Sequence, residues 1–326
     1  MMRKLNMSLC FLLSFGLIAM AVAAQAQDYP SKPIRLIVPF GTGGATDTSG
    51  RALAEALERR INQRIVVENR AGAGGNIGTE LVAQSSPDGY TLLLALDATM
   101  VVNPFTLSKV PFDTIKDFGP VTKLGDVALV LAAHPSLPAK NLAELLAYSK
   151  AHPNKLSYAS GGNGSTTHVA GELLKQRTGL DMQHVAYKSG GLAVLDAVGG
   201  QVQLTYSAAA GSNAHIRAGR LVGIGVSTTK RIGSLPDVPT FIEQGLSNFE
   251  AVSWVGIMAP AKTPRPIIDR LHAEITAALT EPELRRRFDA LGIEPVGNTP
   301  EEFAAQIRAD MARWQAVVER AKIKAD

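Results

Sequence analysis

Twice in this chain a short apolar strand, a glycine-rich turn and a helix follow one another, and this order is the strongest constraint on the fold. In the first half, the apolar segment 34–40 leads into the turn 41–44, and a helical pattern follows. In the second half, segment 155–159 leads into the turn 161–164, again before a helical pattern. Apolar strands that alternate with helices are typical of a parallel sheet covered on both faces. The order therefore predicts an α/β fold with two lobes and a cleft between them.

Further strands are expected where apolar and β-branched residues run together between helical patterns. The segments concerned are 65–68, 91–96, 202–206, 221–226 and 254–259, and one more strand is expected within 121–133. Continuous apolar runs of this length indicate strands that are buried on both faces. Each half of the chain thus supplies enough strands for a sheet of its own.

Three helices are expected to begin at recognisable capping residues. Segment 141–144 resembles a capping box with asparagine in first place, segment 280–283 fits the box itself, and segment 299–302 places threonine, proline and glutamate at the N-cap, N1 and N3 positions. The last helix then carries an apolar stripe at helical spacing, formed by Phe303, Ile307, Met311, Trp314 and Val318. Such a stripe predicts packing against a core.

Residues 1–26 have the layout of a secretory signal peptide. Two basic residues precede an apolar run at 9–24, and residues 24–26 match the small-residue cleavage pattern. The alternative is a transmembrane anchor, which needs about 20 apolar residues, and the small-residue ending favours cleavage. The single cysteine, Cys10, lies inside this run. The mature chain is therefore expected to be soluble, exported and free of cysteine.

Composition and spacing argue against several classes of function. The lone cysteine excludes a disulfide framework and a cysteine-rich metal site, and none of the six histidines has another four residues later. The glycine clusters match neither the dinucleotide fingerprint nor the phosphate-binding loop, and no G-x-S-x-G nucleophile elbow occurs. A formal net charge of +4 and 6% aromatic residues do not indicate a nucleic-acid partner. No cofactor or metal is expected.

The two glycine turns have the chemistry to hold an anion. Segment 40–47 offers small residues and hydroxyls, with Asp47 expected as the N-cap of the next helix, and segment 160–168 offers hydroxyls, an amide and main-chain N–H groups. Small residues let a ligand approach the backbone, and a helix N-terminus presents unpaired N–H donors and partial positive charge. Two such turns facing one cleft predict a receptor for a small organic anion. The alternative is that both are ordinary strand-to-helix turns.

Motifs along the whole chain resemble those of one family. They are Y-P-S-K-P-I at 29–34, P-F-x-x-G-G-x-x-D at 39–47, V-E-N-R-x-G-A-G-G-N-I-G at 67–78, P-D-G-Y-T-L-L at 87–93, G-S-T-T-H at 164–168, G-G-Q-V at 199–202 and L-P-D-V-P-T at 235–240. These motifs are similar to those of Bug-type receptors, the solute-binding proteins of tripartite tricarboxylate transporters. The resemblance implies a type II periplasmic-binding-protein fold, whose two lobes close on a ligand about a two-segment hinge. It implies that residues 28–125 with 252–326 form lobe 1 and that residues 126–251 form lobe 2.

The resemblance also implies where the ligand binds. The implied site comprises the two glycine turns and two strand ends, with Phe40, Gly41, Thr42, Gly43, Gly44, Ala45, Thr46, Asp47, Asp97, Thr99, Ser160, Gly161, Asn163, Gly164, Ser165, Thr166, His168 and Ser207. Many relatives have a small polar residue where this chain has Asp97, which prompts the hypothesis that its carboxylate contacts an amino or hydroxyl group of the ligand. The alternative is that Asp97 caps a turn through its own backbone. Thr42 replaces a proline often found in that turn.

The function expected from this resemblance is that of a monomeric periplasmic receptor without catalysis. It would capture a small carboxylate, such as a di- or tricarboxylate, an acidic amino acid or an aromatic acid, by closure of the lobes. It would then deliver the ligand to integral membrane permease subunits of the transporter. Two alternatives are an exported sensor or partner protein of the same fold and a secreted hydrolase that uses the same cleft. The missing nucleophile elbow and metal motifs disfavour the hydrolase.

Overall fold

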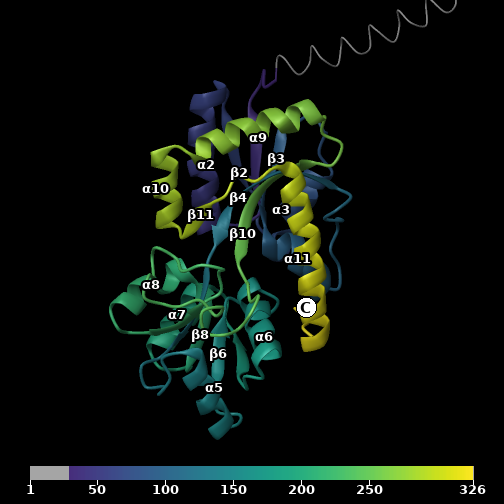
Figure 1. The fold of residues 1–326 in the computed structure, drawn as a ribbon. Helices are drawn as coiled ribbons and strands as arrows, with labels where there is room; N and C mark the ends of the chain where they lie inside the picture. The colour runs from purple at the N-terminus through teal and green to yellow at the C-terminus, as the bar shows by residue number, and fades with distance from the viewer. Residues whose placement is uncertain (1–28, 326) are drawn as a thin grey trace, which may run out of the picture.

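Two sheets flanked by helices form two lobes that lie end to end (Figure 1). The structure, a computed structural model, describes residues 29–325, and the predicted signal peptide lies outside this range. Lobe 1 holds a six-stranded sheet in the order β11-β4-β10-β3-β1-β2, and lobe 2 holds a five-stranded sheet in the order β7-β6-β8-β5-β9. The predicted two-lobed α/β fold is confirmed. None of the helices in residues 29–325 is long and apolar enough to cross a membrane.

The strands follow the predicted segments with three differences. Lobe 1 contains β1 (Ile34–Val38), β2 (Ile65–Asn69), β3 (Thr91–Leu96), β4 (Phe118–Val127), β10 (Ser253–Pro260) and β11 (Ile293–Pro295). Lobe 2 contains β5 (Leu129–Ala133), β6 (Ser157–Ser160), β7 (Gln183–Ala186), β8 (Leu204–Ala208) and β9 (Val222–Val226). The single strand expected within 121–133 is in fact two strands, one in each lobe. The sequence patterns predicted neither β7, which is partly polar, nor β11, which is very short.

Helices cover both faces of each sheet. In lobe 1, one face packs on α2 (Ala45–Ile61), α9 (Arg265–Leu279) and α10 (Pro282–Ala290), and the other on α3 (Asn76–Ala83), the turn η2 (Ala98–Val102), α4 (Asn103–Thr106) and α11 (Pro300–Ala321). The short turn η1 (Ala73–Gly75) precedes α3. Lobe 2 has α5 (Leu142–Ala151), α6 (Thr166–Thr178), α7 (Gly190–Val198) and α8 (Ala209–Arg217).

Two of the three predicted helix starts are confirmed. Helix α5 begins after the N-cap Asn141, and α11 begins with a complete capping box at Thr299. The box predicted at 280–283 is wrong, because α10 begins at Pro282 and Thr280 ends the preceding helix α9. Proline is favoured at the first helical position, so Pro282 sets the start of α10.

The chain crosses between the lobes twice. It leaves lobe 1 at the end of β4, passes through Ala128 and enters β5 directly, and it returns after β9 through segment 227–252 to β10. The crossings are hydrogen-bonded to each other, since the N–H of Ala251 donates to the carbonyl of Ser227 and the N–H of Ser227 donates to that of Leu129, both at 2.9 Å. This is the two-segment hinge of the expected fold. The residue limits assigned to the lobes stay a prediction.

The directions of the strands bring several strand ends to the junction between the lobes. Strand β1 runs parallel to β3, β3 is antiparallel to β10, and β10 is antiparallel to β4. Strands β1, β3 and β4 therefore end at the same edge, where β10 begins. In lobe 2, β6 is parallel to β8 and β8 is antiparallel to β5, so β6 and β8 end where β5 begins. Because β4 continues directly into β5, the turns after β1, β6 and β8 all lie at the junction.

Among residues 29–325, the buried apolar cluster that spans both lobes lies on the side of α11, and on the other side the start of α8 lies close to Gly292 of lobe 1. A buried cluster on the side of α11 contains residues of both lobes, among them Trp254 and Trp314 of lobe 1 and Tyr158 and Leu174 of lobe 2. On the opposite side, the buried residues under α2, α9 and α10 form a cluster within lobe 1, and two smaller clusters lie within lobe 2. Figure 1 shows α11, in yellow, running down from lobe 1 beside α6. The lobes can therefore part most easily on the side of α2, α7 and α8.

Candidate functional site

The turn between β1 and α2 lies at the edge of lobe 1 and is open to solvent. Residues 41–45 are exposed. Apart from chain neighbours, no atom lies within 4 Å of the position that a Cβ would take on Gly41 or Gly43. Gly43 has a φ of +82°, a left-handed conformation that favours glycine. A ligand can therefore approach the backbone of this turn closely.

Helix α2 begins without a side-chain cap. Its N-cap is Gly44, which has no side-chain acceptor for the first-turn N–H groups of residues 45–47. The helix is 17 residues long, and its aligned peptide dipoles add partial positive charge at this end. The uncapped N–H groups and the helix dipole suit this helix start to a carboxylate, and the negative charge of Asp47 in the same turn is offset by its pair with Arg51.

Asp47 supports the turn and does not cap the helix. The sequence prediction made it the N-cap, but it lies inside the first turn of α2 and only 3% of it is exposed. Its carboxylate accepts hydrogen bonds from the N–H of Gly43 and the amide of Asn69, each at 2.9 Å, and pairs with Arg51 at 3.0 Å. Burial alone would raise the pKa of Asp47, but the hydrogen bonds from Arg51, Gly43 and Asn69 outweigh burial and lower the pKa. Asp47 thus holds the turn in place as a carboxylate.

The second glycine turn, between β6 and α6, uses its donors internally. The N–H of Gly161 donates to Oγ1 of Thr167 at 3.0 Å, and the N–H of Gly164 donates to Nδ1 of His168 at 3.1 Å. Ser165 caps α6 by accepting a hydrogen bond from the N–H of His168 at 3.2 Å. The two turns look alike in sequence, but α2 has an uncapped start and α6 has a capped one.

Two stacked histidines lie beneath the second turn. The rings of His168 and His184 have centroids 3.5 Å apart and planes 8° from parallel. Nε2 of His184 lies 2.6 Å from Oγ of Ser160, at the end of β6. Burial lowers the pKa of His168 to about 3 and that of His184 to about 4, so both rings are neutral near pH 7. The pair therefore acts as an uncharged support for the turn.

Asp97 is buried between the lobes. Only 1% of it is exposed, and its Oδ2 accepts a hydrogen bond from Oγ1 of Thr166 at 2.9 Å. Its Oδ1 accepts one from Oγ of Ser253 at 2.5 Å. Both carboxylate oxygens of Asp97 are thus bonded to protein hydroxyls. Thr166 belongs to lobe 2, so Asp97 forms a hydrogen bond between the lobes. Neither sequence hypothesis for Asp97, contact with the ligand or capping of a turn, included such a bond.

Three other predicted site residues also bond to the protein. Thr99 is buried and donates to the carbonyl of Gly74 at 2.9 Å. Ser207 is buried, with its Oγ 2.6 Å from that of Ser212. Asn163 is exposed, and its amide donates to a carbonyl in the tail after α11. Thr99 and Ser207 therefore support the junction from inside the protein, and Asn163 joins the second turn to the tail after α11 at the surface.

Helix α8 provides a second uncapped helix start at the junction, which the sequence patterns did not predict. Its N-cap is Ala208, which follows β8 directly and has no side-chain acceptor, although the N–H of Ala209 donates to the carbonyl of Ala128 at 2.8 Å. No atom lies within 4 Å of the Cβ position on Gly211, in the first turn. A usable signal was present, because the small residues at 207–211 follow the predicted strand 202–206 just as the first turn follows segment 34–40.

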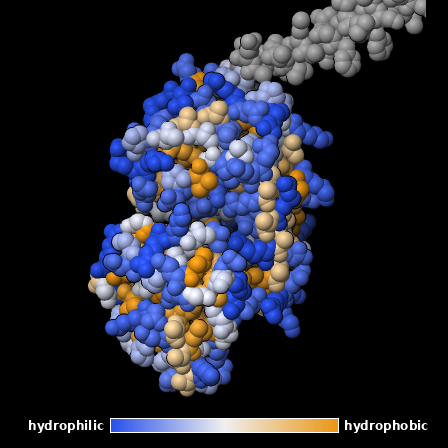
Figure 2. All heavy atoms as spheres, in the orientation of Figure 1, coloured by the Kyte–Doolittle hydropathy of each residue, from blue (hydrophilic) through white to orange (hydrophobic). Residues whose placement is uncertain are grey.

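A cavity of about 590 Å³ lies between the lobes on the side of β11. Its walls include Asp126, Asp289 and Glu294 from lobe 1 and Ala209 and Lys230 from lobe 2. The volume is within the range of small-molecule sites, but none of the predicted ligand-binding residues lines it. Figure 2 shows the surface drawn in where the lobes meet. Within residues 29–325, no group of three or more His, Cys, Asp or Glu side chains is placed to hold a metal ion.

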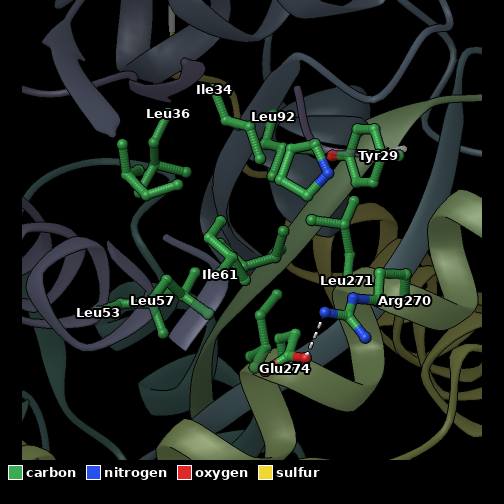
Figure 3. Close-up of a pocket in the computed structure, with 14 residues that line it drawn as sticks. Tyr29, Ile34, Leu36, Leu53, Leu57, Ile61, Leu92, Arg270, Leu271 and Glu274 are labelled. Atoms are coloured by element: carbon green, nitrogen blue, oxygen red, sulfur yellow. Dashed lines mark ion pairs between the residues drawn. The ribbon is translucent and has the colours of Figure 1, made fainter. Parts of the chain in front are cut away.

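Two further cavities lie within single lobes. One of about 390 Å³ is a shallow depression between α7 and α8, lined by Ser189, Leu192 and Gly211 among others. The other, of about 10 Å³, lies in the core of lobe 1 between the sheet and helices α2 and α9 (Figure 3). Figure 3 shows aliphatic side chains around it and the ion pair of Arg270 with Glu274, 3.1 Å apart, at its edge. This gap holds at most one water and is too small for a ligand.

The sequence matches a family of transport receptors over most of its length. Residues 50–323 match the family described as "Tripartite tricarboxylate transporter family receptor". Protein BugT of Bordetella pertussis (strain Tohama I) is 38% identical over 307 residues, which cover 93% of this chain and 94% of BugT.

Two solved structures with bound ligands have the same architecture. Rpa4515 of R. palustris with adipate has a TM-score of 0.79 and 32% identity, with 91% of this chain and 99% of that chain covered. MatC from Rhodopseudomonas palustris with bound malate has a TM-score of 0.74 and 31% identity, with 89% of this chain and 100% of that chain covered. The predicted Bug-type resemblance and the periplasmic-binding-protein fold are both confirmed.

Proposed function

Since the chain belongs to the tripartite tricarboxylate transporter receptor family, we propose that it is a periplasmic receptor that closes its two lobes on a small organic carboxylate. The receptor then delivers the carboxylate to the permease subunits of a tripartite transporter in the membrane. It binds and releases its ligand without changing it, as a solute receptor does.

The observation that carries this proposal is the exposed, uncapped start of α2 at the lobe junction. The first-turn N–H groups there have no side-chain cap, and Gly41 and Gly43 leave open space beside them. A carboxylate that accepts hydrogen bonds from these groups gains both the donors and the positive end of the helix dipole. The remaining residues of the turn, from Phe40 to Thr46, then surround it. Lobe 2 closes the site from the turns after β6 and β8.

Dicarboxylates are the ligand class that we propose first. Adipate and malate, the ligands bound in the two similar structures, both carry two carboxylates. The start of α2 in lobe 1 offers a site for one carboxylate, and the N–H groups of residues 210 and 211 in α8 of lobe 2 would take the other, since the N–H of Ala209 already bonds to Ala128. Tricarboxylates, acidic amino acids and aromatic acids are the other carboxylates to compare.

A thermal-shift screen followed by calorimetry tests the proposal. The mature protein is heated with adipate, malate, succinate, citrate, glutamate or benzoate, and each acid that shifts the melting temperature is titrated by calorimetry. A ligand at 100 times its dissociation constant adds about 2.7 kcal/mol of stability, which raises Tm by several degrees in a protein of this size. We expect at least one dicarboxylate to do so. The proposal fails if none of these acids raises Tm.

A further inference from the structure

Asp97 is the residue at which lobe 1, lobe 2 and the hinge meet. It follows β3 directly, its Oδ2 bonds to Thr166 at the start of α6 in lobe 2, and its Oδ1 bonds to Ser253 at the start of β10, where the chain returns from lobe 2. The carboxylate is almost fully buried. Because Asp97 lies between these segments, the burial of its carboxylate depends on how the two lobes are placed relative to each other.

We propose that Asp97 is a positioning residue whose burial between Thr166 and Ser253 couples closure of the lobes to the uptake of a proton. The inference rests on the proposed function only for the closing motion and does not depend on which carboxylate binds. It gives Asp97 a role other than ligand contact.

The physical basis is the loss of water around a carboxylate whose hydrogen-bond partners carry no charge. Burial raises the pKa of Asp97 to about 6, although the hydrogen bonds from Ser253, Thr166 and the N–H of Ala98 act in the opposite direction. The proposed opening withdraws Thr166, at the start of α6, from Asp97 and lets water reach the carboxylate, while the rest of α6 stays packed on α11. The pKa then falls toward its ordinary value, so the closed form binds a proton more tightly than the open form.

Charged groups on neighbouring elements do not cancel this effect. From α11, the carboxylate of Asp310 raises the pKa of Asp97 further, and Asp310 is itself bonded to Arg313 at 2.8 Å. The positive charge of Lys123 on β4 lowers the pKa of Asp310. From α6, His168 is neutral near pH 7 because burial lowers its pKa to about 3. Burial is therefore the largest influence on the ionisation of Asp97.

The expected size of the coupling follows from proton linkage. We take the arrangement in which Asp97 bonds to Thr166 and its pKa is about 6 as the closed form, and a solvated carboxylate with the usual pKa of 3.8 as the open form. Closing is then accompanied by proton uptake between these two pH values. The closing equilibrium constant should then be about tenfold larger at pH 5 than at pH 7.5. Acidification is therefore expected to favour the closed form. If closure instead required the ionised carboxylate of Asp97, acidification would favour the open form.

Distance measurements between spin labels on the two lobes test this inference without any ligand. The single cysteine of the chain lies in the predicted signal peptide, so the mature protein can be labelled at Arg286→Cys on α10 and Leu195→Cys on α7. Both positions are exposed and lie on the side where the lobes can part. We expect the short-distance population to grow from pH 7.5 to pH 5. Asp97→Asn, which keeps the shape but cannot titrate, should abolish this change.

Two further variants separate the role of Asp97 from general effects of acid. Asp310→Asn should retain a pH response, because Asp97 still titrates. Thr166→Val removes a hydrogen bond that favours the ionised form, so it should move the response to higher pH. An unchanged distance distribution between the two pH values, or the same pH response in Asp97→Asn, would overturn the inference. Since no ligand is added, such a result leaves the proposed carboxylate binding untouched.

Discussion

Gly44 is the residue on which the proposed binding chemistry depends most directly. It occupies the N-cap of α2 with φ −75° and ψ 168°, a backbone conformation that any capping residue can adopt. Glycine leaves the first-turn N–H groups uncapped, whereas a side-chain acceptor at this position would occupy one of them. A ligand carboxylate and a capping side chain therefore compete for the same donors.

Replacement of Gly44 should change stability and affinity in opposite directions. Gly44→Asp supplies a side-chain cap and a negative charge, so the free energy of unfolding should rise by about 0.5 kcal/mol. Affinity for the best carboxylate should fall at least about tenfold, since that is a loss of about 1.4 kcal/mol. Urea unfolding and calorimetry measure the two effects. Ala147→Asp, exposed on α5, adds the same charge elsewhere and should leave affinity unchanged. Unchanged affinity in Gly44→Asp would show that the ligand does not bind at the start of α2.

Asp47 should contribute to stability through the turn that it holds. Asp47→Ala removes a buried carboxylate and leaves its three hydrogen-bond partners, Gly43, Asn69 and Arg51, without it. This should lower the free energy of unfolding, measured in urea, by about 1–3 kcal/mol. The pKa of Asp47 is lowered in the folded state, so this contribution is present above the unfolded pKa and is lost as pH falls through the folded value. Asp269→Ala, which removes an exposed partner of Arg265 at 2.6 Å, should cost less than about 0.5 kcal/mol. Equal losses in both variants would contradict the account.

Local sequence patterns predict some of these single-residue roles and cannot predict others. Ser165 is predicted from the sequence as a ligand contact, whereas the structure makes it the N-cap of α6, a role that a serine before a helical pattern also fits. The partners of Asp97 are 69 and 156 positions away in the sequence, and no local pattern connects them. The role of Asp97 therefore required the three-dimensional structure.

Helix α11 is the element that ties the lobes together, and it packs closely on the sheet of lobe 1. The ring of Phe303 lies directly over Gly256 in β10, where an added Cβ would be 2.4 Å from the ring. Gly256→Ala should therefore force a shift of α11 and cost about 1–3 kcal/mol in urea unfolding. Gly233→Ala, with no atom within 4 Å of its Cβ position, should leave stability nearly unchanged. A neutral Gly256→Ala would show that α11 is held elsewhere.

The turn between β6 and α6 should lose its support in acid. His184 has a pKa lowered to about 4, so its folded form binds fewer protons than the unfolded chain. The stability that neutral His184 contributes is complete above its unfolded pKa and is lost as pH falls toward 4; because the ring is only partly buried, solvent screening limits this loss to about 1–2 kcal/mol. His184→Phe keeps a stacking ring and should lose less stability between pH 6.5 and pH 4. Identical profiles for the wild-type protein and His184→Phe would contradict this role.

At the scale of elements, the sequence predicts periodic segments well and their limits less well. The strand at 91–96 and the helix starts at Asn141 and Thr299 appear as predicted, since apolar periodicity and capping depend on neighbouring residues. The division between β4 and β5 at Ala128 was not readable, because the chain runs straight from one sheet into the other. Its apolar pattern is unbroken there.

For the whole molecule, the uneven packing of the lobes determines how they can move. One apolar cluster continues across both lobes beside α11, while the clusters on the other side stay within single lobes. A closing motion should therefore pivot near α11 and narrow the junction between α2 and α8. Periodicity alone could not pair β10 and α11 with the first lobe, because that pairing joins distant segments. The family resemblance supplied it.

The crystal structure of the mature protein with adipate or malate tests the central claim most directly. The account predicts closed lobes with one ligand carboxylate about 2.7–3.2 Å from the first-turn N–H groups of α2. It also predicts that Asp97 remains bonded to Thr166 and does not touch the ligand. A ligand bound instead in the cavity of about 590 Å³ beside β11, with the start of α2 free of it, would contradict the account.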